Sequence, residues 1–171
     1  DLGAFVSISD KLDTICGCFG VGLIPTGSAD PYALRRSAIG ILNILISRNY
    51  SLSIPKLVGQ SLDLLSAKLT RPRAEVQVEV VDFFRGRLLN ILTGQGYATD
   101  LVEAVLSASF DDPTDACERV KALAALKDHA DFEPLAAAFK RIGNIIKGGV
   151  EAPIEPALFE VECEGALFNE L

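Results

Sequence analysis

Apolar residues recur every three to four positions along almost the whole chain, which is the spacing of one face of an α-helix. Five large apolar residues mark the first such face: Phe5, Ile8, Leu12, Ile15 and Phe19. Similar patterns predict helices over about 31–47, 54–69, 72–93, 100–107, 113–124, 132–147 and 158–168. No segment predicts a strand, so the fold class expected from the sequence is all-α.

Turn and capping residues place the ends of these helices. The first helix should end near Gly17 and Gly20, before a glycine-rich loop that extends to Asp30. Asp30 before Pro31 predicts an N-cap followed by proline at the first helical position, and Asp112 before Pro113 repeats this start. Asp100 with Glu103 predicts a capping box.

Two of the predicted helices differ in their apolar faces. The helix over 31–47 is apolar nearly all round, which is typical of a central, buried helix. The helix from Phe132 is amphipathic, and we expect its apolar side to face inward: Leu135, Ala138, Phe139, Ile142, Ile145 and Ile146. It should end at Gly148 and Gly149, with Lys147 in its last turn.

Charge is segregated along the chain. The formal net charge is −7, but residues 151–171 hold six acids and no base. Residues 30–90 carry nine basic and five acidic side chains. The acidic average therefore does not exclude a nucleic-acid surface on one part of the protein.

Most catalytic chemistry lacks the residues it needs. His129 is the only histidine, so a histidine-paired nucleophile or a metal site with several imidazoles is not expected. The glycine-rich loop lacks the order of a phosphate-binding loop. The four cysteines match no zinc or disulfide framework, and no signal-peptide pattern is present, so reduced thiols in a cytoplasmic protein are expected. Apolar runs are too short for a membrane span.

The basic residues remain as candidates. Lys140, Asn144 and Lys147 share one helical stripe, with Arg141 beside it. Such a stripe is typical of an ordinary solvated helix face or of a surface that tracks an RNA backbone. The second group of candidates is Arg71, Arg73, Arg85 and Arg87. Arg35 and Arg36 are expected to be structural, through an ion pair with Asp10, Asp13 or Asp30 that ties the glycine-rich loop to the following helix.

Several sequence blocks together resemble a known family. They are ISDKLDT (8–14), GCFGVG (17–22), PTGSADPYALRR (25–36), FFRGRL (83–88) and KRIGNI (140–145). In this combination they resemble the β subunits of bacterial, two-subunit glycyl-tRNA synthetases. One departure is Gly86, where the family usually carries an acid.

The resemblance implies a division of the chain. Residues 1–50 would be the end of a helical domain similar to HD phosphohydrolases, whose metal dyad the family generally does not use. Residues 51–171 would be a truncated anticodon-binding helical domain of the DALR type. With Asp1 at its start and no methionine, the sequence is expected to be a piece of a longer chain.

The resemblance also implies a function. The α subunit of the family carries the catalytic core and uses ATP and magnesium, whereas the β subunit supplies tRNA recognition in an assembly of two α and two β chains. We therefore expect an RNA-binding portion of a ligase, without catalytic residues, metal or cofactor of its own. The alternative is a helical scaffold whose acidic tail and last helix bind a protein partner; an HD-type phosphohydrolase is disfavoured by the single histidine.

Overall fold

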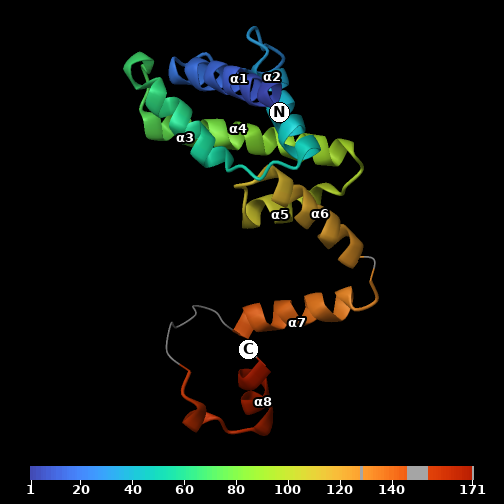
Figure 1. The fold of residues 1–171 in the computed structure, drawn as a ribbon. Coiled ribbons are helices and arrows are strands. Elements are labelled where there is room, and N and C mark those ends of the chain that lie inside the picture. The colour runs from blue at the N-terminus through green and yellow to red at the C-terminus, as the bar shows by residue number, and fades with distance from the viewer. Residues whose placement is uncertain (128, 146–153, 171) are drawn as a thin grey trace. The chain divides into compact units, whose positions relative to one another are not determined.

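The computed structural model describes residues 1–127, 129–145 and 154–170, which belong to two compact units, 1–129 and 130–171 (Figure 1). The first unit contains α1 (Leu2–Gly20), α2 (Leu34–Arg48), α3 (Ile54–Leu64), the 3₁₀ turn η1 (Ser66–Lys68), α4 (Arg73–Gly94), α5 (Thr99–Ala108) and α6 (Pro113–Lys127). The second contains α7 (Phe132–Ile145), the 3₁₀ turn η2 (Pro156–Leu158) and α8 (Glu162–Glu170). Within the described residues the only extended pairing is an isolated bridge between Thr26 and Ala29, so the all-α prediction is confirmed.

Helices α1 to α6 enclose one hydrophobic core. The long helix α4 packs against α1, α2, α3 and α5, and α6 packs against α2 and α5. Phe19 of α1 contacts Phe83 of α4, with 5.1 Å between their ring centroids. Helix α2 buries Leu34, Ala38, Ile41, Leu42 and Leu45, as its nearly continuous apolar sequence predicts.

The start of α2 differs from the prediction. Pro31 is not its first helical residue, because residues 30–33 form a turn in which Ala33 adopts a left-handed φ of 54° and the helix begins at Leu34. Asp30 still acts as a cap: its carboxylate accepts hydrogen bonds from the backbone N–H groups of Leu34 (2.8 Å) and Arg35 (3.0 Å). The predicted capping function is confirmed, and the predicted helix start is wrong by one turn.

The start of α5 also differs. The capping box predicted from Asp100 and Glu103 is wrong, because α5 begins at Thr99 and its N-cap position is Ala98. Asp100 is therefore already in the first turn, where its carboxylate accepts from the N–H of Leu101 at 2.9 Å. A carboxylate in a first turn interacts favourably with the helix dipole.

The end of α1 is capped by a distant loop. The backbone N–H of Thr70 donates to the carbonyl of Gly20 at 3.0 Å, and the Thr70 hydroxyl donates to the same oxygen. Gly20 permits this approach, since a Cβ there would overlap the side chain of Leu69. The predicted end of the first helix near Gly20 is thus confirmed, and the close packing explains it.

The second unit exposes its apolar residues. No residue of α7 is buried, and the exposed fractions of Phe139 and Ile145 reach 67% and 81%. The expectation that this face points inward is wrong for the described residues, because periodicity tells which side chains share a face and not what covers it. Ile146, Lys147 and the predicted end at Gly148 and Gly149 lie outside the described residues.

Helix α8 is shorter than predicted. The residues before it form the turn η2, and the helix begins only at Glu162. The Glu164 carboxylate accepts from the backbone N–H groups of Glu160 (2.7 Å) and Val161 (3.1 Å), which caps the helix start. Neither α8 nor any other helix in the described ranges has the length and apolarity to cross a membrane.

The two compact units divide at residue 129, and within the first of them helices α1 and α2 share their core with α3 and α4. The predicted domain boundary after residue 50 stays a prediction. The assignment of either segment to an HD-like or an anticodon-binding domain stays a prediction.

Candidate nucleic-acid interface

The polar face of α7 presents the first group of predicted RNA contacts. Lys140, Arg141 and Asn144 are all exposed. At 3.6 residues per turn, Lys140 and Asn144 are about 40° apart around the helix, and Arg141 lies within about 100° of Lys140. Two cations and one carboxamide therefore share a side of the helix opposite Phe139 and Ile142. Lys147 lies outside the described residues.

Arg71 is engaged in a bidentate contact. Both terminal nitrogens of its guanidinium donate to the carboxylate of Glu79 at 2.7 Å, and Nη1 also donates to the carbonyl of Phe19 at 3.3 Å. The hydrogen bonds from Arg71 hold the pKa of Glu79 below its ordinary value. Arg71 thus joins the end of α1 to α4, a structural function that the sequence pattern does not show.

The Glu79 contact predicts a pH dependence. Since the pKa of Glu79 is lower in the folded protein, its ion pair stabilises the fold above the ordinary carboxyl pKa of about 4.5. That contribution is lost as the pH falls through the lowered value. Glu79→Gln should reduce stability at pH 6 and much less at pH 3, by a modest amount because Glu79 is 40% exposed.

Urea unfolding of the wild type and the variant across this pH range would measure the effect. Glu103→Gln on the exposed side of α5 is the matched control, because Glu103 has no ion pair among the described residues. An equal loss for Glu79→Gln at both pH values would contradict the prediction.

Arg73 is held by three acceptors. Its Nε donates to Asp63 at 2.6 Å, Nη1 to the side-chain carbonyl of Gln77 at 2.8 Å, and Nη2 to the backbone carbonyl of Gly59 at 3.2 Å. These contacts link α3 to α4. The hydrogen bond that Arg73 donates to the Asp63 carboxylate raises the pKa of Arg73 further, so it stays protonated.

Arg85 and Arg87 also contact their neighbours. Arg85 donates to the hydroxyl of Ser107 on α5 at 2.9 Å. Arg87 lies over the ring of Phe83, 5.4 Å from its centroid, and its Nε is buried without a hydrogen bond. The predicted RNA contacts of all four arginines remain predictions, and the structure gives each of them an internal contact.

Arg35 ties the glycine-rich loop to α2 through a different partner from the one expected. Its Nη2 donates to the backbone carbonyl of Gly27 at 2.7 Å. The expected ion pair of Arg35 or Arg36 with Asp10, Asp13 or Asp30 is wrong: the salt bridges of the described residues include none of these pairs, and Arg36 is exposed.

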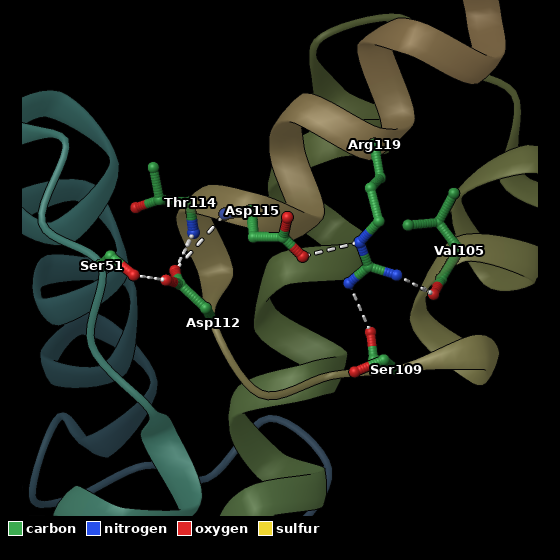
Figure 2. Close-up of polar contacts among 7 residues, drawn as sticks. All are labelled: Ser51, Val105, Ser109, Asp112, Thr114, Asp115 and Arg119. Atoms are coloured by element: carbon green, nitrogen blue, oxygen red, sulfur yellow. Dashed lines mark hydrogen bonds and ion pairs between the residues drawn. The ribbon is translucent and has the colours of Figure 1, made fainter.

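A polar junction joins the α2–α3 loop to the start of α6 (Figure 2). Asp112 accepts from the backbone N–H of Thr114 at 2.8 Å, which confirms its capping function, and from the hydroxyl of Ser51. The Thr114 hydroxyl donates to the carbonyl of Tyr50 at 3.1 Å. Segments more than 60 residues apart are thereby fixed to each other.

Arg119 is the centre of a second contact set that sequence reasoning missed. It donates to the carboxylate of Asp115 at 2.8 Å and to the carbonyls of Ser109 (2.8 Å) and Val105 (3.3 Å) (Figure 2). Val105 and Ser109 are at the end of α5, where the carbonyl of Val105 also accepts from the backbone N–H of Ser109, so Arg119 adds side-chain donors to the last carbonyls of the helix. The i,i+4 spacing of Asp115 and Arg119 was the one available signal.

Reactive groups are few in this structure. Cys16, Cys18, Cys117 and Cys163 are free thiols. Burial raises the pKa of Cys16 to about 11, which disfavours the reactive thiolate. Across the described ranges, no group of three His, Cys, Asp or Glu side chains is arranged to hold a metal ion.

Comparison with known proteins identifies the family. Residues 1–107 match the family model described as glycyl-tRNA synthetase beta subunit. The whole chain is 61% identical to the glycine–tRNA ligase beta subunit of Syntrophotalea carbinolica, of which it covers 25%, and 57% identical to that of Trichlorobacter lovleyi, also covering 25%. The corresponding protein of Geobacter sulfurreducens is 61% identical over 98% of this chain and 24% of the relative. The chain therefore spans about a quarter of the length of these relatives, and it belongs to the glycyl-tRNA synthetase β-subunit family.

Proposed function

We propose that the chain is a tRNA-recognition portion of a glycyl-tRNA synthetase β subunit, which assists the ATP-dependent ligation of glycine to its tRNA by an α subunit. The observation that carries the proposal is 61% identity, over the entire chain, to a protein named glycine–tRNA ligase beta subunit. The exposed cations of α7 add a surface suited to phosphate contacts.

The proposed contribution to catalysis is positioning. Contacts far from the reacting atoms can hold a substrate in the geometry of the transition state, and their binding energy then lowers the barrier at the reaction centre. In this proposal Lys140, Arg141, Asn144 and Lys147 hold the RNA backbone, with Arg71, Arg73, Arg85 and Arg87 as secondary contacts. The α subunit forms the glycyl-tRNA bond.

ATP and magnesium are assigned to the partner subunit. This assignment follows the expected division of labour between the subunits, in which the α subunit carries the catalytic core. The glycine-rich loop also lacks the lysine and hydroxyl order of a phosphate-binding loop. We propose an assembly of two α and two β chains in the cytoplasm, with the tRNA for glycine as its substrate.

The α7 surface can be tested by removing its two described cations together. In the full-length β subunit assembled with its α subunit, Lys140→Ala with Arg141→Ala should weaken binding of the glycine tRNA about tenfold. Each phosphate contact contributes a slope of roughly 0.7–0.9 in the dependence of log affinity on log salt, so that dependence should also become shallower. Filter binding at several salt concentrations would measure both quantities.

The matched control removes two exposed cations of the other unit, Arg48→Ala with Lys68→Ala, and leaves the α7 surface intact. If the Lys140 and Arg141 variant keeps both wild-type affinity and wild-type salt dependence, the RNA contact assigned to α7 is wrong.

A scaffold function without RNA contact is the second candidate. It is favoured by the exposed apolar side of α7, which includes Leu135, Phe139, Ile142 and Ile145. Association through this side would depend little on salt, because apolar helix contacts release few counterions. Salt dependence of the complex therefore discriminates between the two candidates.

A further inference from the structure

A polar groove lies between α3 and α4, outside the predicted lysine stripe. Its volume is about 360 Å³, and it is lined by Lys56, Gly59, Gln60, Asp63, Arg73 and Gln77. Arg73 begins α4 beside Asp63 at the end of α3, whereas Lys56 lies in the first turn of α3, so the groove follows both helices along their contact. Pro55 also lines it, and apart from Pro55 and Gly59 the lining residues carry polar or charged side chains on apolar stems.

The wall of the groove is fixed in place. Gln77 accepts from Arg73 through its side-chain oxygen and donates through its nitrogen to the carbonyl of Pro55 at 3.5 Å. The guanidinium also packs against Gly59: its Nη2 lies 3.5 Å from the place that a Cβ at residue 59 would occupy, an ordinary contact distance. Arg73 is thereby held in one orientation by acceptors from both helices.

Groups that can bind a ligand remain open in this groove. A guanidinium carries five N–H donors, and the three contacts of Arg73 use one on each nitrogen, which leaves two. The side chain of Arg73 is 43% exposed. Lys56 and Gln60 are exposed, and no hydrogen bond of their side chains occurs among the contacts of the described residues. Two cations and one carboxamide therefore face the same opening.

We propose that this α3–α4 groove binds an RNA strand, with Lys56 and Arg73 on a phosphate and Gln60 on a ribose or a base edge. Lysine and arginine bind phosphate, and carboxamides read ribose and base groups. Asp63 reduces the formal charge of the groove to +1, which suits the single charge of one RNA phosphate better than a polyphosphate. The inference rests on the proposed tRNA function and adds a second contact region to it.

The test compares two lysine variants of the full-length β subunit assembled with its α subunit, with glycine tRNA as the probe. Lys56→Ala should weaken binding three- to tenfold and make the salt dependence shallower by about one phosphate contact. Gln60→Ala should weaken binding without changing the salt dependence. Lys68→Ala is the matched control, because Lys68 is exposed in the same unit and does not line the groove.

The outcomes separate the two proposals. If the wild-type protein binds the tRNA and the Lys56→Ala variant binds it as tightly, the RNA contact proposed for the groove is wrong and the proposed tRNA function stands. If Lys56→Ala and Lys68→Ala weaken tRNA binding equally, the RNA contact proposed for the groove is also refuted, because the general loss of surface charge then explains the weaker binding. If the wild-type assembly shows no salt-dependent tRNA binding, the proposed function fails and the groove fails with it. Thermal melting of each variant verifies that these exposed substitutions leave the fold intact.

Discussion

Phe84→Ala should lower the free energy of unfolding of the 1–129 unit by about 3–5 kcal/mol, the range for truncating a buried aromatic side chain. Phe84 has no exposed surface and lies on the side of α4 that faces the common core. Its ring meets that of Phe83 nearly edge-on, with centroids 6.5 Å apart and planes at 76°. Alanine would remove both the apolar burial and this contact, and would leave a cavity in the core between α4 and the helices packed against it.

Hydrogen exchange of the amides of α4 in the full-length β subunit would measure the loss, since exchange reports the local unfolding of one unit within a larger protein. Val78→Ala is the control on the same helix: its side chain is 62% exposed, and a change below about 0.5 kcal/mol is expected. Equal protection of α4 in the two variants would show that Phe84 does not have the packing function assigned to it.

The helices could be predicted because each buries a face with a period near 3.6. Residues such as Val76, Val80 and Leu88 of α4 are buried at this spacing. The start of α2 could not be predicted, since a left-handed conformation at Ala33 has no signal in that residue type. The unburied face of α7 shows a different limit, because amphipathicity identifies a surface that can be covered without identifying its partner.

The candidate site was predicted less well than the fold. Arg71 and Arg73 were singled out for their charge, but their acceptors come from residues as far away in sequence as Phe19 and as near as Gln77. Spacing along one helix shows which cations share a stripe and cannot show which of them already have a tertiary partner. Lys56, which opens onto the α3–α4 groove, was not singled out because it belongs to no stripe or cluster in the sequence.

The family could be recognised from the blocks between residues 8 and 36, and the match over residues 1–107 confirms it. These blocks combine features with separate physical functions. Asp30 caps α2, Arg35 holds the carbonyl of Gly27, and Gly20 permits the close approach of the 69–71 segment. The same residues that carry the resemblance therefore organise the turn between α1 and α2.

Arg119→Ala should lower the free energy of unfolding by about 2 kcal/mol, because hydrogen bonds that involve a charged group contribute about 1.5–3 kcal/mol each and Arg119 is partly exposed. Its guanidinium bridges two carbonyls at the end of α5 and the Asp115 carboxylate on α6. Removing it leaves those two helices joined mainly by apolar contacts around Val105 and Val120. We expect α5 and α6 to lose protection from exchange before α1 and α4 do.

Arg119→Lys distinguishes the bridging geometry from the charge. A lysine can keep the i,i+4 pair with Asp115, which at this exposed position contributes only about 0.3–0.5 kcal/mol. It cannot present planar N–H groups to two carbonyls and a carboxylate at once. In hydrogen exchange, the amides of α5 should therefore be about as weakly protected in the lysine variant as in the alanine variant. Full protection in Arg119→Lys would show that the positive charge, rather than the bridge to Val105 and Ser109, stabilises the junction.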